Sequence, residues 1–388
     1  MLSTSASQSI KPSYIREILK AASEESVISF AGGLPDESSF PMQLMAPAFK
    51  ELQEKPQLFQ YSQTIGYAPL LDKLKEDYQV SSKNNLMVTS GSQQGLDLIA
   101  RAFIKAGDKI LVESPCYLGA LQVFELAKAD ILTVDRVNGE LDFAQMEAVF
   151  LAHDITCFYF VADFQNPTGV CYSRQEREKI ASLCRQFNVT IVEDAPYREL
   201  RFEGESLPLV SSYYPENAIV LRSFSKVVSP GLRLATLEAS QSIIDTLVKI
   251  KQITDLHSNV PSQFVVLQLL NNPLFLIHQQ RVKAIYQKKK SLMIKQLSMA
   301  LTDSVTVNNV EGGMFLWVHI ESKNKLNMLA LAQDSLAQGV AVVPGEVFNS
   351  NTDKYQPNLR LNFSHASESE IIKGVEILAK VINSYIQG

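Results

Sequence analysis

Between about residue 66 and residue 240 the chain alternates strand-like and helical segments, and this alternation restricts the fold more than any other feature. Residues 155–161 form an almost continuous apolar run, which is typical of a strand buried in a parallel sheet. Residues 92–106 carry apolar side chains on one helical face, and 109–113 follow as a short strand. This order predicts an α/β fold, with a mostly parallel central sheet between helices. The other strands are expected at 86–89, 131–134, 189–193, 218–222 and 232–237, and the other helices at 119–127 and 174–187.

After residue 240 the pattern becomes mainly helical, and the remainder predicts a smaller α+β domain. Pro273 precedes a helical segment that runs to about residue 301 without a breaker. Short strands are expected at 314–319, 340–343 and 359–363, before a last helix over 367–386. We therefore expect residues 1–60 to form an N-terminal arm and part of the small domain, 61–270 the large domain, and 271–388 the C-terminal small domain.

Composition and charge exclude several classes of protein. The net charge is −5, which argues against a nucleic-acid-binding surface, and the basic run at 288–290 is predicted to be a solvated helix face. No apolar run of about 18 residues predicts a membrane span, and residues 1–11 lack the apolar stretch of a signal peptide. The four cysteines are widely spaced, and the five histidines lack metal-binding spacing. We expect a cytoplasmic protein with reduced thiols and no metal, nucleic-acid or membrane partner.

The segment from Ser223 to Arg233 carries the strongest chemical signal. It places Lys226 beside the hydroxyls of Ser223 and Ser225, with Arg233 following in the same segment. This grouping suits a lysine that forms a Schiff base with an aldehyde cofactor carrying a phosphate. The hydroxyls and the guanidinium can bind the phosphate while the amine holds the aldehyde carbon. A polar loop with a solvated lysine has the same composition and is the alternative interpretation.

Two further segments place polar groups at the ends of predicted elements. The loop at 90–95 joins a strand to a helix, and Ser92 is expected to be the N-cap, where free amides attract a phosphate. Asn166 follows the strand at 155–161, and ligands of open α/β sheets bind at the carboxyl ends of strands. A capped turn and a simple Asn-Pro turn are the respective alternatives.

Asp194 and Arg360 are charged residues in or beside apolar strands. Asp194 follows the strand at 189–193, so it can pair with a protonated ring nitrogen, and the phenol of Tyr197 can donate to a ring oxygen. Arg360 alternates with apolar residues, and a substrate carboxylate is a suitable bidentate partner if the side chain points inward. A cap for the following turn and a structural salt bridge are the alternatives.

Taken together, these motifs resemble a fold type I, class I pyridoxal-phosphate aminotransferase over essentially the whole chain. Asn-Pro-x-Gly at 166–169, Asp194 with Tyr197, the Ser-x-Ser-Lys-x-x-x-x-Gly-x-Arg loop and Arg360 occur in that order. Segments 29–35, 61–67, 90–96 and 164–169 are similar to the 2-aminoadipate (lysine-biosynthesis) and kynurenine aminotransferase II group.

The resemblance implies pyridoxal 5'-phosphate as cofactor and a homodimer with shared active sites. It also implies a ping-pong reaction that moves the α-amino group of an amino acid to a 2-oxo acid such as 2-oxoglutarate. Glutamate, 2-aminoadipate, leucine and aromatic amino acids are the expected donors.

The same resemblance assigns residues to the cofactor ring. Lys226 is similar to the lysine that holds the aldehyde, and Asp194 to the partner of the pyridinium nitrogen. Asn166 and Tyr197 resemble the pair that hydrogen-bonds the ring 3-oxygen, and Tyr117 resembles the aromatic residue stacked on the ring.

The remaining implied roles concern the phosphate and the substrate. Tyr61 resembles a tyrosine that reaches the phosphate of the neighbouring subunit. Arg360 resembles the anchor of the substrate α-carboxylate, helped by Asn166 and the Gly33 backbone. The residues of the implied phosphate site are Ser92, Gln93, Ser223, Ser225 and Arg233.

Substrate choice is the least determined property. Residues 13–17 are similar to an N-terminal helix whose serine and arginine help to recognise the substrate side chain, so Ser13 and Arg16 are candidates. An arginine there suits acidic side chains, whereas a helix that swings aside would admit apolar or aromatic ones. A surface arginine is the alternative for Arg16. Glu238 departs from the pattern, because a neutral residue is expected where that strand ends.

Two other functions compete with a transaminase. A β-lyase, decarboxylase or racemase can use the same Lys226, Asp194 and Arg360, because these reactions differ in the orientation of the labile bond over the ring. A cofactor-sensing regulator on this fold needs an N-terminal DNA-binding domain. We expect none, because the motif at 29–35 begins within the first thirty residues.

Overall fold

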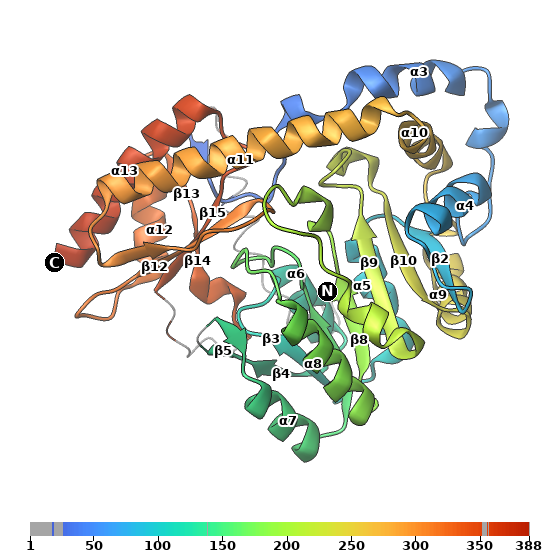
Figure 1. Cartoon of the computed structure of the whole chain (residues 1–388), viewed down its shortest axis with the longest axis horizontal. Helices are drawn as coiled ribbons and strands as arrows, with labels where there is room; N and C mark the ends of the chain where they lie inside the picture. The colour runs from blue at the N-terminus through green and yellow to red at the C-terminus, as the bar shows by residue number, and fades with distance from the viewer. Residues whose placement is uncertain (1–17, 19–25, 138, 351–354, 356, 388) are drawn as a thin grey trace, which may run out of the picture.

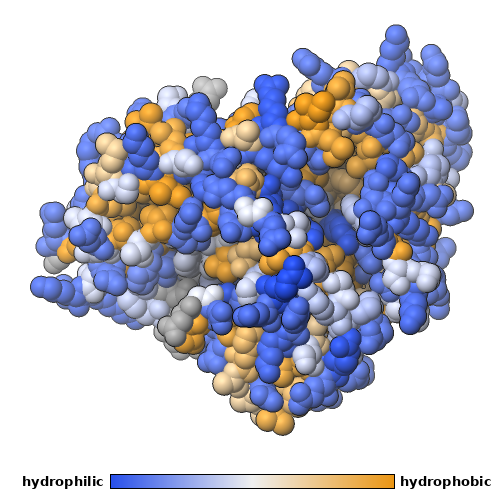
Figure 2. All heavy atoms as spheres, in the orientation of Figure 1, coloured by the Kyte–Doolittle hydropathy of each residue, from blue (hydrophilic) through white to orange (hydrophobic). Residues whose placement is uncertain are grey.

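The computed structural model describes residues 18, 26–137, 139–350, 355 and 357–387. Figure 1 shows two sheet-containing bodies, and a long helix, α11 (Leu274–Ala300), runs across both. Most of the surface in that view is hydrophilic, with apolar patches between the polar residues (Figure 2).

The larger body is built on a seven-stranded sheet, in the order β2-β10-β9-β8-β7-β3-β4. The pairs from β9 through β8, β7 and β3 to β4 are parallel, whereas β10 is antiparallel to both of its neighbours. The prediction of a mostly parallel sheet is therefore confirmed. Its strands are β2 (Asn84–Thr89), β3 (Lys109–Glu113), β4 (Asp130–Val134), β7 (Ile155–Phe160), β8 (Thr190–Asp194), β9 (Ala218–Ser223) and β10 (Ala235–Ser240).

Successive residues of these strands supply two different cores, because side chains alternate between the faces of a sheet. Tyr159 of β7 belongs to the core on the side of α5, α6 and α9, whereas Phe158 and Phe160 belong to the core on the side of α7 and α8. A third core joins α3, α4 and α10 to the end of the sheet near β2. The helices of this body are α3 (Met42–Leu52), α4 (Ala68–Asp77), α5 (Ser92–Phe103), α6 (Leu118–Leu126), α7 (Phe143–Ala152), α8 (Arg174–Gln186), α9 (Gln241–Asp255) and α10 (Val260–Leu270).

The smaller body contains an antiparallel sheet in the order β11-β12-β15-β14. Its strands are β11 (Val305–Val307), β12 (Phe315–Ile320), β14 (Val343–Pro344) and β15 (Asn358–Asn362), and α12 (Met328–Ala337) and α13 (Glu368–Gln387) complete it. Strand β1 (Ile28–Ser29) pairs with β13 (Val340–Ala341), which joins the N-terminal segment to this body. Strands β5 (Arg136–Val137) and β6 (Glu140–Leu141) form a separate antiparallel ribbon, which lies between β4 and α7 in the sequence.

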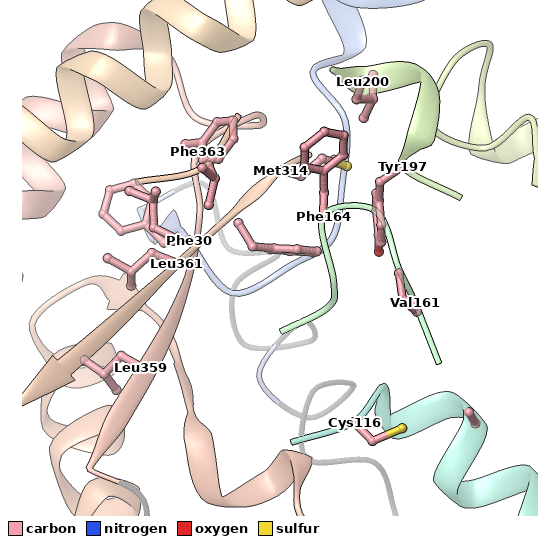
Figure 3. Packing of buried hydrophobic residues seen from close by; sticks show 14 of the residues in the cluster. Phe30, Cys116, Val161, Phe164, Tyr197, Leu200, Met314, Leu359, Leu361 and Phe363 are labelled. Carbon is pink, nitrogen blue, oxygen red and sulfur yellow. The ribbon is translucent and has the colours of Figure 1, made fainter. Parts of the chain in front are cut away.

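The two bodies share a continuous apolar core. Figure 3 shows Leu359, Leu361 and Phe363 of the smaller body in the same cluster as Val161 and Phe164, which follow β7. The described residues between 26 and 60 are divided between the bodies, because β1 pairs with β13 while α3 packs against α10. The domain boundaries at 60/61 and 270/271 remain our prediction.

One predicted strand begins later than expected. Residues Pro230–Leu232 form a 3₁₀ turn, and Arg233 has a left-handed backbone with φ of 50°, so β10 starts at Ala235 and not at residue 232. Glu238, whose presence in this strand was unexpected, pairs with Arg222 of β9 at 2.7 Å. Because Glu238 and Arg222 are both half-buried, each charge offsets the burial of the other, and the strand can hold an acid at this position.

The prediction that residues 288–290 form a solvated helix face is wrong for two of the three lysines. Lys289 and Lys290 are buried, and only Lys288 is exposed. The Lys289 Nζ lies 2.6 Å from Asp36 Oδ2 and 3.0 Å from the Ser364 carbonyl oxygen. The Lys290 Nζ lies 2.9 Å from Glu203 Oε1. The helix therefore binds the N-terminal segment through one lysine and the loop after β8 through the next.

Within the described ranges, no single helix is both long and apolar enough to cross a membrane. Helices α10 and α11 meet the length and composition test only as a pair bent by 90°. The four cysteines are all free thiols, three of them buried and Cys171 half-buried.

Replacing Lys289 by alanine is expected to lower the free energy of unfolding by about 2 kcal/mol, because Asp36 loses the partner that offsets its partial burial. Lys288→Ala, on the exposed neighbour, is the matched control and is expected to cost less than about 0.5 kcal/mol. Urea denaturation of both variants measures the difference. Equal losses would contradict the assignment of Lys289 as a buried structural cation.

Candidate active site

A cavity of about 310 Å³ lies where the two bodies meet the carboxyl edge of the parallel sheet. Every predicted site residue in the described part of the chain except Tyr61 lines it. The lining residues are Gly33, Leu34, Ser92, Gln93, Tyr117, Val161, Asn166, Asp194, Pro196, Tyr197, Ser223, Ser225, Lys226, Arg233 and Arg360. The residues that the sequence did not single out are Leu34, Val161 and Pro196, apolar positions that no motif distinguishes from ordinary core.

Three parallel strands position the central residues. Asn166 lies in the loop after β7, Asp194 is the last residue of β8, and Ser223 is the last residue of β9. Parallel strands end at one edge of a sheet, so these positions, separated by tens of residues in the sequence, come together.

Lys226 follows β9 and reaches across the cavity to the N-terminal segment. Its Nζ donates to the Gly33 carbonyl oxygen at 2.7 Å. Burial, together with the positive charges of Arg360 and Arg233, lowers the pKa of Lys226 to about 8. This amine therefore loses its proton much nearer to neutral pH than an ordinary lysine does, and the neutral amine is the nucleophile.

Asp194 is almost fully buried. Its Oδ2 accepts a hydrogen bond from the Tyr159 hydroxyl at 3.0 Å, while its Oδ1 has no partner among the described residues. Burial raises the pKa of Asp194 to about 7, and the hydrogen bond from Tyr159 opposes this rise. An unpartnered buried carboxylate oxygen that lines a cavity is a site for a cationic ligand group.

Tyr197 and Asn166 lie beside each other at the same edge. Burial raises the pKa of Tyr197, while its hydrogen bond to the Asn166 side chain acts in the opposite direction. The Tyr197 ring meets Phe315 of the smaller body edge-on, with centroids 5.8 Å apart. A protonated phenol and an amide can both serve a ring oxygen.

One end of the cavity is formed around the start of α5. The structure corrects the predicted cap: Gly91, with φ of 91°, is the N-cap of α5, and Ser92 is its first helical residue. A glycine is needed there because its backbone is left-handed and a Cβ would collide with the Arg233 guanidinium. Ser92 and Gln93 still lie in the first turn, where free backbone amides attract anions.

Arg233, Ser223 and Ser225 complete this end of the cavity. The Arg233 guanidinium donates to the Ser90 carbonyl oxygen at 3.3 Å, and the Ser223 hydroxyl accepts from the Ser225 backbone at 3.2 Å. Tyr117 precedes α6, and its hydroxyl donates to the Gln93 side chain at 3.2 Å. Hydroxyls, an arginine and a helix N-terminus together match the chemistry of a phosphate group.

Arg360 enters the cavity from β15 of the smaller body and is 2% exposed. It donates to Asn166 Oδ1 at 2.7 Å and to the Ala31 carbonyl oxygen. Its guanidinium lies 4.4 Å from the ring centroid of Phe315 and 4.9 Å from that of Phe348. No carboxylate of the described residues pairs with it, its Nε has no partner, and burial lowers its pKa to about 10. The salt-bridge alternative therefore has no partner in the described ranges.

One predicted residue lies outside this constellation, and two others are not described by the structure. Tyr61 does not line the cavity, is 79% exposed, and meets the ring of His257 edge-on at 6.0 Å. Ser13 and Arg16 lie outside the described residues, so their roles rest on the sequence alone.

Comparisons with known proteins agree with this geometry. The family model of aminotransferase class I and II matches residues 25–378. The chain belongs to the class I and II aminotransferases.

Two curated relatives of this aminotransferase cover nearly the whole chain. The aromatic-amino-acid aminotransferase 1 of Thermococcus litoralis is 34% identical over 96% of this chain and 92% of its own length. The 2-aminoadipate transaminase of Thermus thermophilus is 35% identical over 97% of this chain and 95% of its own. An α-aminoadipate aminotransferase structure from Thermus thermophilus, complexed with N-(5'-phosphopyridoxyl)-L-leucine, superposes with a TM-score of 0.92 at 33% identity, over 99% of this chain and 98% of that one.

The aminotransferase is thus a pyridoxal-phosphate-dependent transaminase of fold type I. The cavity fits this cofactor by its own chemistry. The Asp194 Oδ1, which has no partner among the described residues, suits a protonated ring nitrogen, and the start of α5 together with Arg233 suits a phosphate. Lys226 has the lowered pKa that a Schiff-base lysine needs.

The raised pKa of Asp194 predicts a pH effect on the chain without cofactor. The unfolded chain loses this proton near pH 4 but the folded chain only near pH 7, so the contribution of Asp194 to folding is full below pH 4 and is lost as the pH rises to about 7. Asp194→Asn removes the titration. The free energy of unfolding of the variant minus that of the unsubstituted chain should therefore increase by about 2–3 kcal/mol from pH 5 to pH 8.5. Urea denaturation at both pH values measures this; a pH-independent difference would contradict it.

Proposed function

We propose that this transaminase moves the α-amino group of an amino acid to a 2-oxo acid such as 2-oxoglutarate by a ping-pong mechanism. The observation that carries the proposal is the convergence of Lys226, Asp194 and Arg360 on one cavity, each with its pKa shifted towards the neutral form and none paired with an opposite charge of the described residues. Such groups are suited to an aldehyde, a cationic ring and a carboxylate, respectively.

Each residue has a separate task in the proposed reaction. The bound cofactor supplies an electron sink for the electrons left when the substrate α-proton departs. Asp194 would hold the protonated ring nitrogen, and Tyr197 with Asn166 would hold the ring 3-oxygen. The free amine of Lys226 would serve as the base that takes the proton from the substrate Cα and as the acid that later gives it up. Arg360 orients the substrate through its α-carboxylate, with Asn166 beside it.

The rival reactions use the same groups. A β-lyase, decarboxylase or racemase would differ only in which substrate bond stands over the ring. The aminotransferase names of relatives that cover nearly the whole chain support transamination over these alternatives.

The cavity wall supports a broad donor range. Its apolar members are Leu34, Val161 and Pro196, and its charged members among the described residues already have roles in holding cofactor or α-carboxylate. A charge that recognises an acidic side chain must then come from another part of the protein, for which Arg16 is the candidate. We propose glutamate, 2-aminoadipate, leucine and aromatic amino acids as donors.

We further propose a cytoplasmic homodimer. The exposed ring of Tyr61 supports it, because a tyrosine that does not reach its own cavity can serve the phosphate of a neighbouring subunit. Four free cysteines are consistent with a reducing compartment.

Mixing the holoenzyme with glutamate and with a panel of other amino acids tests the reaction. The expected result is loss of the visible cofactor absorbance and formation of pyridoxamine phosphate. Lys226→Ala should slow this half-reaction at least about 10³-fold, because both the covalent anchor and the base are lost. Lys288→Ala, on an exposed helix position, should leave it unchanged. Absence of a half-reaction with every amino acid would favour a rival reaction.

Arg16→Ala tests side-chain recognition separately. We expect kcat/KM for 2-aminoadipate and glutamate to fall by about tenfold or more, with leucine changed by less than about threefold, because only acidic side chains can pair with the guanidinium. Arg174→Ala, an exposed arginine at the start of α8, is the control. Equal losses for leucine and 2-aminoadipate would remove Arg16 from the specificity site.

A further inference from the structure

The two oxygens of the Asp194 carboxylate have different surroundings. Oδ2 accepts the Tyr159 hydroxyl at 3.0 Å, whereas Oδ1 is buried with no partner among the described residues. Asp194 lines the cofactor cavity and Tyr159 does not. A single hydrogen bond therefore distinguishes the structural oxygen of this carboxylate from the one left for a ligand.

Tyr159 is held rigidly behind the cavity. It lies on β7, opposite Val192 of the neighbouring parallel strand β8, and is fully buried. Its ring meets Phe124 of α6 edge-on, with centroids 5.7 Å apart. The ring is thus fixed between the sheet and a covering helix, and its hydroxyl position is set by packing and not by solvent.

The direction of the hydrogen bond is fixed by charge. Burial and the negative charge of Asp194 raise the pKa of Tyr159 well above its usual value, so the phenol keeps its proton and donates. A hydrogen bond donated to a carboxylate favours the charged form of the acid, against the burial that favours the neutral form.

We infer that Tyr159 is a positioning residue for the cofactor: its hydroxyl fixes Asp194 Oδ2, favours the charged carboxylate and leaves Oδ1 for the protonated ring nitrogen. Tyr159 acts through Asp194 and makes no contact with the cavity itself. The inference rests on the role proposed above for Asp194.

Tyr159→Phe removes only the hydroxyl and keeps the ring that packs on Phe124. With the full-length protein, the dissociation constant for pyridoxal phosphate at pH 7.5 should rise about tenfold, because a neutral or misoriented Asp194 pairs poorly with a cationic ring. In the half-reaction with glutamate, the rate constant at saturating glutamate should fall about tenfold or more. The glutamate concentration that gives half of this rate should change by less than about twofold, because the carboxylate anchor Arg360 is untouched.

Tyr172→Phe is the matched control. Tyr172 is also a fully buried tyrosine whose hydroxyl donates to a buried carboxylate, that of Glu113, but it has no contact with Asp194. Its variant should change the cofactor dissociation constant by less than about twofold. An equal effect of the two variants would show a general loss of sheet packing and overturn the inference.

A double variant separates this inference from the proposed role of Asp194. Asp194→Asn alone should weaken cofactor binding, and adding Tyr159→Phe should then change binding by less than about twofold, because the hydroxyl acts through the missing charge. If Asp194→Asn leaves binding intact, the role of Asp194 itself is wrong. If Asp194→Asn weakens binding but Tyr159→Phe alone does not, only the inference about Tyr159 fails.

Should Tyr159→Phe not fold, 3-fluorotyrosine at position 159 gives the test without loss of the hydroxyl. A more acidic phenol donates a stronger hydrogen bond to the carboxylate, so cofactor binding should tighten measurably. Unchanged binding in this substituted protein would overturn the inference.

Discussion

Strands β7, β8 and β9 run parallel and end at one edge of the sheet, and the chemistry of this protein depends on that shared edge. It brings Asn166, Asp194 and the Lys226 loop into one cavity. The same edge is deeply buried, and burial shifts the pKa of Asp194 upwards and that of Lys226 downwards. The site is therefore electrostatically incomplete, and a ligand with a cationic ring and an aldehyde supplies what the protein lacks.

The residue that we propose as the anchor of the substrate carboxylate comes from the other body. Arg360 lies on β15, yet it donates to Asn166 at the edge of the large sheet, so the proposed carboxylate anchor and the proposed ring site are connected by one direct hydrogen bond. The rings of Phe315 and Phe348 flank the guanidinium and keep it away from water. An arginine that pairs with no carboxylate of the described residues favours, in such surroundings, a bidentate carboxylate ligand over solvent.

Local motifs and strand order predicted the sheet and nearly all of the cavity, because Asn166, Asp194 and the 223–233 loop each follow a recognisable apolar strand. What the sequence missed depends on contacts between distant segments. Lys289 looks like a solvated lysine until Asp36, 253 positions away, is placed beside it. Tyr159 reads as an ordinary core aromatic, because nothing local shows that its hydroxyl meets Asp194. At the start of α5, the N-cap position has a positive φ that suits glycine. Gly91 is therefore the N-cap, and Ser92, the predicted N-cap, is the first residue of the helix.

The adjacent lysines of α11 also limit insertions and deletions in this helix. Successive residues of a helix are turned by about 100°, so Lys289 and Lys290 face different segments of the chain. Insertion or deletion of one codon between these lysines and the helix start would rotate both amines away from Asp36 and Glu203 together. Substitutions on the exposed side of α11 are tolerable by comparison, whereas its residue count upstream of position 289 should be among the least variable lengths in the protein.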